Sequence, residues 1–155
     1  MSGLGGADPG SVSRLGGALR TSAARLAADH VGLTSAAGQT PLGTLTGLVV
    51  QRLDALGSAL QVHSQELAEL TVAATALGDR VRVDGLHLDG WRVVEPFGIA
   101  TSQAAARRLA AQPELQAQAD RIASRIGRIR AQLARQLDQA SADLAAAART
   151  ARSAG

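Results

Sequence analysis

The chain has 155 residues, of which 46% are hydrophobic, and it carries a formal net charge of +3 at neutral pH. This length and apolar content fit one folded domain and exclude a chain that is disordered throughout. The absence of cysteine excludes disulfides, thiolate metal sites and cysteine nucleophiles. All 16 basic residues are arginine, and lysine, asparagine and tyrosine are missing, which we interpret as the composition of a high-GC, actinobacterial-type genome.

No segment is long and apolar enough to predict a transmembrane helix, since the best candidate, Leu42 to Leu60, contains Arg52 and Asp54. The N-terminal residues lack the basic start and the apolar run of a secretory signal peptide. We therefore expect a cytoplasmic protein, or one that is exported by a route that needs no signal peptide.

The first ten residues are rich in glycine and predict a flexible arm, followed by a single helical-bundle domain over 11–155. The first helix is expected over 11–37, with a serine as its N-cap. Its apolar positions follow the three- and four-residue spacing of one helix face. Glycine costs about 1 kcal/mol relative to alanine inside a helix, so we expect this helix, which contains Gly16, Gly17 and Gly32, to be the weakest.

The second helix is expected over 41–79, with Pro41 at its first position, and it forms a helical hairpin over 11–79 with the first. It contains the strongest periodic signal of the chain, an unbroken heptad seam. The seam consists of Val49, Leu53, Leu56, Leu60, His63, Leu67, Leu70, Ala74 and Leu77. His63 occupies a core position where leucine is expected, which makes it a candidate pH-sensitive position. The alternative is a histidine whose polar edge reaches solvent or a backbone group.

Residues 80–98 predict a small β-meander that caps the bundle between the second and the last helices. Apolar residues alternate with polar ones, and two Asp-Gly pairs stand where the chain should reverse. Three strands of about three residues are too short to be stable by themselves. We therefore expect Trp91 and Phe97, the only aromatic residues of the chain, to be buried between this cap and the helices.

The C-terminal helices are expected over 101–152, as a short helix to residue 111 and, after a kink or a restart at Gln112-Pro113, the last main helix. The apolar seam of the last helix contains a stutter. It is formed by Ile129, Leu133 and Leu137. The second and last helices should pair antiparallel, with the first helix as third member. The predicted fold is an all-α, elongated antiparallel bundle of three main helices with a small β-like cap.

The last helix carries a second stripe, of glutamine and arginine, beside its apolar one. Its arginines are Arg121, Arg125, Arg128 and Arg135, and no acidic residue interrupts them. Residues 80–155 hold 12 arginines and 7 acids, a net charge of +5. The stripe is a candidate site for an anionic partner or surface; the alternative is a solvated face partly neutralised by acids of the neighbouring helix. Nucleic-acid binding is not expected, because no aromatic residue lies near the stripe to stack on a base.

No motif in the sequence predicts catalysis, a metal site or a cofactor. The three histidines lie in different segments, and no pair of histidines or carboxylates has the spacing of metal ligands. The sequence contains no G-x-S-x-G motif and no glycine-rich loop that joins a strand to a helix. We therefore expect a protein that is not an enzyme and that needs neither a cofactor nor a metal.

The helical hairpin over 11–79 resembles the WXG100 (ESAT-6-like) group and other helical proteins associated with type VII secretion. In that family a Trp-x-Gly turn joins the helices, whereas here the turn is Pro41-Leu42-Gly43, which keeps the glycine but lacks the tryptophan. Such proteins carry a helical aromatic-x-x-x-acid export signal after the hairpin, and Trp91 and Glu95 have that spacing. The resemblance implies a substrate or partner of such a secretion system.

Two functions therefore remain open. The first is a protein-interaction module that binds a second copy of the chain or a helical partner through its helix faces. The second is an amphipathic protein that binds a granule or membrane surface, as the phasins do, with the arginine stripe beside an apolar one. The two differ in whether the apolar stripes of the three helices pack against one another.

Overall fold

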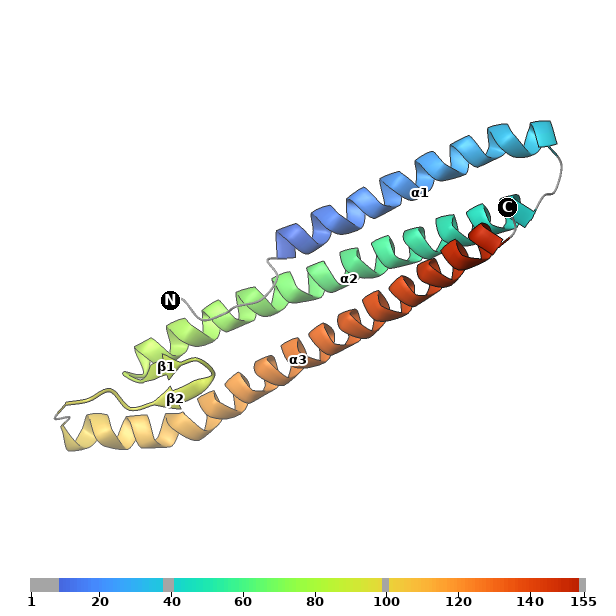
Figure 1. Cartoon of the computed structure of the whole chain (residues 1–155). Helices are drawn as coiled ribbons and strands as arrows, with labels where there is room; N and C mark the ends of the chain where they lie inside the picture. Colours follow the sequence, from blue (N-terminus) through green and yellow to red (C-terminus); the bar gives the residue numbers. More distant parts are fainter. Residues whose placement is uncertain (1–8, 38–40, 99–100, 154–155) are drawn as a thin grey trace. The chain divides into compact units, whose positions relative to one another are not determined.

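The computed structural model describes residues 9–37, 41–98 and 101–153. In these residues three helices pack antiparallel, with a two-stranded β-hairpin between the second and the third (Figure 1). The helices are α1 (Pro9–Ala37), α2 (Pro41–Val83) and α3 (Ser102–Ser153), and the strands are β1 (His87–Asp89) and β2 (Arg92–Val94). The predicted helical fold class is confirmed. No helix in the described part of the chain is apolar enough over a sufficient length to cross a membrane.

The chain divides into two compact units, and both α2 and α3 contribute to each. The β-hairpin unit contains residues 66–129, which include the end of α2, the β-hairpin and the beginning of α3. The three-helix unit contains α1, the beginning of α2 up to Gln65 and α3 from Arg130. The prediction of a single domain over 11–155 stays a prediction.

The observed helix starts follow the capping rules. α1 begins at Pro9, two residues before the predicted start, because a proline in the first turn has no N–H to leave unpaired. The rest of the predicted flexible arm lies outside the described residues. α2 begins at Pro41, as predicted. Thr101 caps α3, since its Oγ1 accepts a hydrogen bond from the backbone N–H of Ala104 at 3.3 Å.

α2 ends at Val83, four residues after the predicted end, and Gly85 stops it. Gly85 has a φ of +72°, and its N–H donates to the carbonyl of Arg82 at 3.0 Å, while the N–H of Leu86 donates to the carbonyl of Val81 at 2.9 Å. This is the Schellman pattern of a helix C-terminus. The predicted first strand of the meander is therefore wrong. Val81 is instead a core residue of the last helical turn, 1% exposed, and Val83 faces solvent.

The β-hairpin has two strands in place of the predicted three. β1 and β2 pair antiparallel with Leu88 opposite Val93, and their loop is Gly90-Trp91. Gly90 has a φ of +58° and Trp91 does not have a positive φ, which fits a type II′ turn. Trp91 packs against the core of the unit, as predicted, but it is only partly buried. The predicted burial of Phe97 is wrong: it follows Pro96, beyond the end of β2, and is fully exposed.

The core of the β-hairpin unit joins all of its elements. It consists of Leu77 and Val81 of α2, Leu86 and Val93 of the hairpin, and Leu115 and Ala119 of α3. Leu88 and Trp91 lie at its edge, partly buried. The apolar residues of the hairpin itself, Leu86, Leu88, Trp91 and Val93, thus pack toward the helices, which supply the core that a hairpin of this size lacks.

Two glutamine side chains of α3 bind the backbone of β2. The N–H of Val93 donates to Oε1 of Gln116 at 2.8 Å, and Nε2 of Gln112 donates to the carbonyl of Val93 at 3.0 Å. Nε2 of Gln116 also donates to the carbonyl of Trp91 at 3.0 Å. The polar groups of Val93 therefore point away from β1, toward α3. The two glutamines satisfy the free edge of β2 and fix the hairpin on the helix.

α3 runs through Pro113 without interruption, so a restart of the helix at Gln112-Pro113 is wrong, while the alternative, a kink, stays a prediction. A proline inside a helix removes the hydrogen bond to the carbonyl four residues earlier, here Leu109, at a cost of about 3 kcal/mol. Leu109 and Pro113 are both exposed, so water can reach that carbonyl. On the buried side, Leu115 and the glutamine contacts with β2 hold the helix on both sides of the proline.

α1 and α2 approach each other closely at Gly16 and Gly57, which are both buried. A Cβ atom added to Gly16 would lie 2.8 Å from the carbonyl oxygen of Gly57 and 3.0 Å from Cβ of Leu60. Val12 and Ala23 on α1 are buried as well. Gly16, which weakens α1 as an isolated helix, is therefore required for its packing.

Substitution of this glycine and of its neighbour should have opposite effects on stability. Gly16→Ala should lower the free energy of unfolding by about 1–3 kcal/mol, because the new methyl group overlaps the α2 backbone. Gly17→Ala is the matched control, since a Cβ there would meet nothing within 4 Å. It should raise stability by about 0.5–1 kcal/mol through helix propensity. Urea unfolding followed by circular dichroism measures both; equal effects at the two positions would contradict the close approach.

Gln116→Met tests the attachment of the β-hairpin. It keeps the size of the side chain but leaves the N–H of Val93 unpaired in a partly buried place, at a cost of about 1–3 kcal/mol. The fluorescence of Trp91 should shift to the red as the hairpin loosens. Gln103→Met, at an exposed position near the start of α3, should change neither property. Unchanged emission and an unchanged urea midpoint in Gln116→Met would show that the glutamine does not hold the hairpin.

Candidate functional site

The four arginines predicted as interaction candidates are exposed on α3. Arg121, Arg125 and Arg128 belong to the β-hairpin unit, and Arg135 belongs to the three-helix unit. None of the four has a carboxylate within ion-pair distance among the residues that the structure describes. Asp54, an acid on the neighbouring helix, pairs with Arg20 of α1 instead, with 3.2 Å between Nε and Oδ1. The stripe is a positively charged face.

The apolar stripe beside the arginines packs against α2 in the β-hairpin unit. Ile129 is 6% exposed and forms a cluster with Leu67 and Leu70 of α2. Ile122 and Ile126 are partly buried and pack against the same cluster. The isoleucines next to Arg121, Arg125 and Arg128 are therefore engaged within the fold.

His63 lies in the core of the three-helix unit and is 4% exposed, as its heptad position predicts. Its Nε2 lies 3.0 Å from Oε1 of Gln136, and because an amide oxygen only accepts, Nε2 carries the proton of this hydrogen bond. The seam of α3 thus passes through Gln136, whereas Leu137 is 39% exposed. The predicted stutter through Leu137 is wrong. The residue that faces the core after Leu133 is Gln136, three residues on, and not Leu137, four residues on. The pH sensitivity of His63 stays a prediction.

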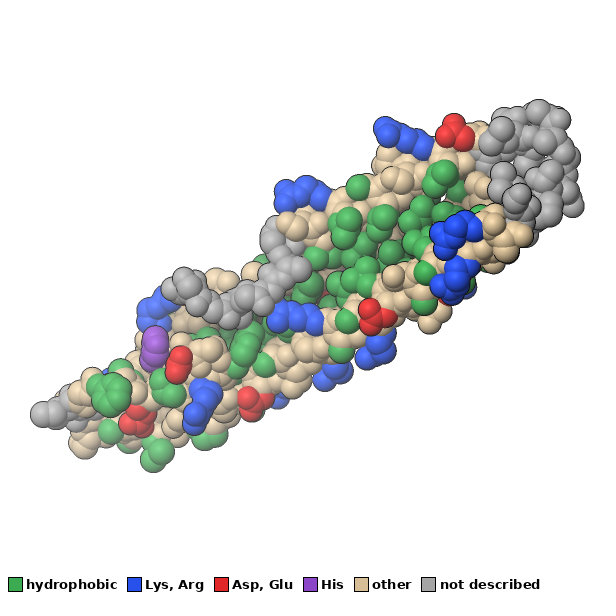
Figure 2. All heavy atoms as spheres, in the orientation of Figure 1, with side chains coloured by type: hydrophobic (Ala, Val, Ile, Leu, Met, Phe, Trp, Pro, Cys, Tyr) green, Lys and Arg blue, Asp and Glu red, His purple; other side chains and the backbone are tan. Residues whose placement is uncertain are grey.

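An open apolar groove lies in the three-helix unit, among the three helices, with a volume of about 310 Å³. It is lined by Leu26 of α1, by Leu45, Thr46 and Val49 of α2, and by Leu144, Ala147, Ala148 and Ala151 of α3. Figure 2 shows hydrophobic side chains gathered between α1 and α3 in this unit. Several of these residues belong to the predicted seams. They do not close on one another because the alanines of α3 are too short to fill the space between the helices.

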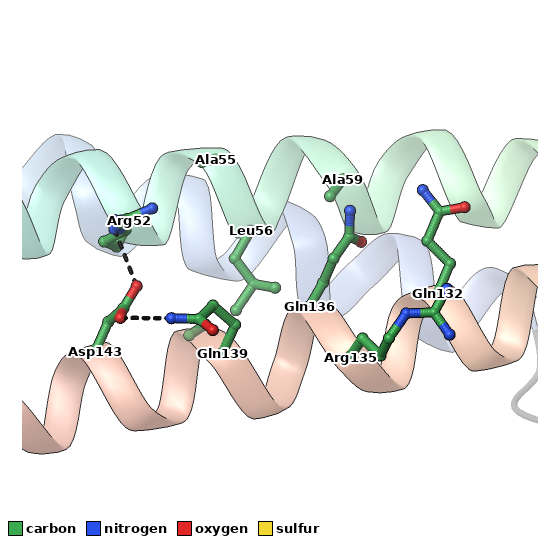
Figure 3. A pocket seen from close by; sticks show the side chains of 10 residues that line it. Arg52, Ala55, Leu56, Ala59, Gln132, Arg135, Gln136, Gln139 and Asp143 are labelled. Atoms are coloured by element: carbon green, nitrogen blue, oxygen red, sulfur yellow. Dashed lines mark hydrogen bonds and ion pairs between the residues drawn. The ribbon is translucent and has the colours of Figure 1, made fainter.

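Two polar-rimmed hollows lie between α2 and α3, one within each unit. The Arg121 hollow, of about 320 Å³, is lined by Ala73, Ala76, Leu77, Arg80, Gln118, Arg121 and Ile122. The Arg135 hollow, of about 290 Å³, is lined by Arg52, Ala55, Leu56, Ala59, Gln132, Arg135, Gln136, Gln139, Ala140 and Asp143 (Figure 3). Sequence periodicity did not predict either hollow, because each depends on how α2 and α3 are aligned. The only signal for the hollows in the sequence is the presence of alanines on one face of α2.

The described residues contain no group of three or more histidine, aspartate or glutamate side chains that could hold a metal ion. Comparisons of the chain with protein-family models, with curated proteins and with solved structures find no match. The resemblance to the WXG100 group therefore stays an expectation from the sequence, and the function has to be argued from the groove and the hollows.

Proposed function

We propose that the protein is a non-enzymatic helical interaction module. It binds a helical protein partner, or a second copy of itself, through the apolar groove of the three-helix unit. The observation that carries the proposal is the groove itself, where Leu26, Val49 and Leu144 line an open space in place of a closed core. Removing apolar surface from water is worth about 25 cal/mol per Å², and contiguous exposed apolar patches mark interaction sites.

The shape of the groove favours a helix as the bound element. One side of the groove consists of Ala147, Ala148 and Ala151, which follow one another along α3 at one- and three-residue steps. Short side chains let a neighbouring helix approach closely, while Leu26 and Leu144 can interdigitate with its larger side chains. A bound helix would complete the packing that α1, α2 and α3 leave unfinished.

The alternative, a phasin-like protein that coats granules or membranes, has weaker support. It needs an apolar stripe that is free beside the arginines, but Ile122, Ile126 and Ile129 pack against α2. Among the residues that the structure describes, no charged one lines the open apolar groove. The basic face and the apolar groove are therefore separate surfaces, which suits protein binding better than insertion into a lipid surface.

The narrower proposal of a type VII secretion substrate or partner is supported by the spacing of Trp91 and Glu95. These residues lie in the β-hairpin and just after it, whereas the resemblance implies a helical signal. Glu95 is exposed, so Glu95→Ala should leave folding unchanged. In a host that encodes such a system, this substitution should abolish export of the tagged protein to the medium. Export that is independent of Glu95, or no export of the wild type, would contradict this narrower proposal.

The groove predicts that the protein associates at micromolar concentration. Light scattering should show a mass above that of the monomer, or the protein should purify from its native host in a fixed stoichiometry with a helical partner. Leu26→Glu places a charge in the groove and should weaken the association at least about tenfold, equivalent to about 1.4 kcal/mol.

Leu15→Glu is the matched control for this variant. Leu15 lies on the same helix and is 51% exposed, compared with 37% for Leu26, but it does not line the groove. The same substitution there should leave the association unchanged. A monomer that purifies without a partner, or equal effects of the two substitutions, would contradict the proposed function.

A further inference from the structure

The two hollows between α2 and α3 repeat one arrangement of charged and amide groups. Arg80 of α2 lines the Arg121 hollow, and its Nη2 lies 3.4 Å from Oε1 of Glu114 on α3, which does not line the hollow itself. The same oxygen accepts a hydrogen bond from Nε2 of Gln118, four residues along α3, at 3.1 Å. The charge of Arg80 is thus compensated within the protein.

The Arg135 hollow has the same construction in the three-helix unit. Nε of Arg52 on α2 lies 3.2 Å from Oδ2 of Asp143 on α3, and Oδ1 of Asp143 accepts from Nε2 of Gln139 at 2.8 Å. Figure 3 shows these three side chains joined at one end of the hollow, with Arg135 toward the other end. Again an arginine of α2, an acid of α3 and a glutamine four residues away form a closed set.

On the α2 side, the apolar part of each hollow consists of two alanines and one leucine; α3 adds Ile122 to the Arg121 hollow and Ala140 to the Arg135 hollow. The α2 residues are Ala73, Ala76 and Leu77 in the Arg121 hollow, and Ala55, Leu56 and Ala59 in the Arg135 hollow. They lie three, four and seven residues from the paired arginine, before Arg80 in one hollow and after Arg52 in the other. The two hollows are therefore lined by similar residues in opposite directions along α2, with the leucine three residues from Arg80 and four residues from Arg52.

One positive charge remains uncompensated in each hollow. Arg121 and Arg135 line the hollows, and neither has a carboxylate within ion-pair distance in the part of the chain that the structure describes. From Arg121 to Arg135, α3 carries five arginines and no acid. The complementary ligand is a carboxylate that lies beside small apolar groups.

We propose that each hollow binds an acidic side chain of a partner α-helix, with Arg121 or Arg135 as the cation. The alanines of α2 leave room for the backbone and small side chains of that helix, and charge complementarity selects its glutamates or aspartates. Nucleic acid is a poorer fit because none of the described residues that line the two hollows is aromatic. The proposal does not depend on the apolar groove, which has a different lining.

The test measures binding of a fluorescein-labelled, alanine-rich helical peptide that carries glutamate at three- and four-residue intervals along one face. Fluorescence anisotropy with the full chain at low ionic strength should show binding, and the same peptide with glutamine should bind at least about tenfold more weakly. Arg121→Gln and Arg135→Gln should each weaken binding of the glutamate peptide about three- to fivefold. Arg149→Gln, an exposed arginine of α3 that lines neither hollow, should change nothing.

A second pair of variants tests the hollows without changing charge. Ala73→Leu and Ala55→Leu fill the apolar part of each hollow at exposed positions, so the fold should be kept and peptide binding should fall. Ala68→Leu, an exposed position of α2 outside the hollows, is the control. Leu26→Glu should still bind the peptide, which separates this proposal from the apolar groove.

Three results would overturn the proposal. The first is no binding of the glutamate peptide. The second is an equal loss for Arg149→Gln, or no loss for the alanine-to-leucine variants, which would mean attraction by net charge. The third is competition by free glutarate as strong as that of unlabelled peptide, which would assign the hollows to a small carboxylate and not to a helix.

Discussion

Small side chains set the distance between the helices, and the rest of the structure depends on this constraint. Gly16 and Gly57 bring the backbones of α1 and α2 so close that a Cβ atom at Gly16 would lie 2.8 Å from a backbone oxygen. Ala119 is completely buried where α3 meets α2 and the β-hairpin. With one phenylalanine, one tryptophan and no tyrosine, the chain has few side chains able to fill a thick core. Its stability therefore rests on close approach of backbones and on exact pairing of polar groups at the few places where they are buried.

The same constraint explains where the surface is open. Where three helices meet, alanine side chains on α3 cannot close the space, and the apolar groove results. Where two helices meet, alanines on α2 leave the polar-rimmed hollows. Buried polar groups occur in matched pairs, such as His63 with Gln136, or the backbone of Val93 with Gln112 and Gln116. The described side chains leave no buried polar atom without a hydrogen-bond partner, so the unfinished part of the structure is apolar, which is the part that a second helix can complete.

The sequence predicted the elements well where a local rule decides the structure. Pro41 and Thr101 mark helix starts, the heptad seam of α2 carries Leu60, His63 and Leu67 into the core, and the Gly90 turn forms a hairpin.

The prediction from the sequence failed where two local rules competed. Val81 fits both a strand with a period of two and the last turn of a helix. The helix formed, because Gly85 can adopt the positive φ that ends it four residues later. Pro113 breaks an isolated helix, but the contacts of its neighbours with β2 keep α3 continuous. The seam position of Gln136 was missed because a leucine follows it. The groove and the hollows depend on the alignment of separate helices, which periodicity within one helix does not specify.

The central claim is that a helix covers the apolar groove in the assembled protein, and a spin label in the groove tests it most directly. Because the chain contains no cysteine, Ala148→Cys and Ala146→Cys each provide a unique attachment site. Both alanines are exposed on α3, but only Ala148 lines the groove. Electron paramagnetic resonance of the associated protein, or of its purified complex, should show an immobilised label at 148 and a mobile one at 146. Equal mobility at the two positions, at every protein concentration and in the complex, would contradict the account.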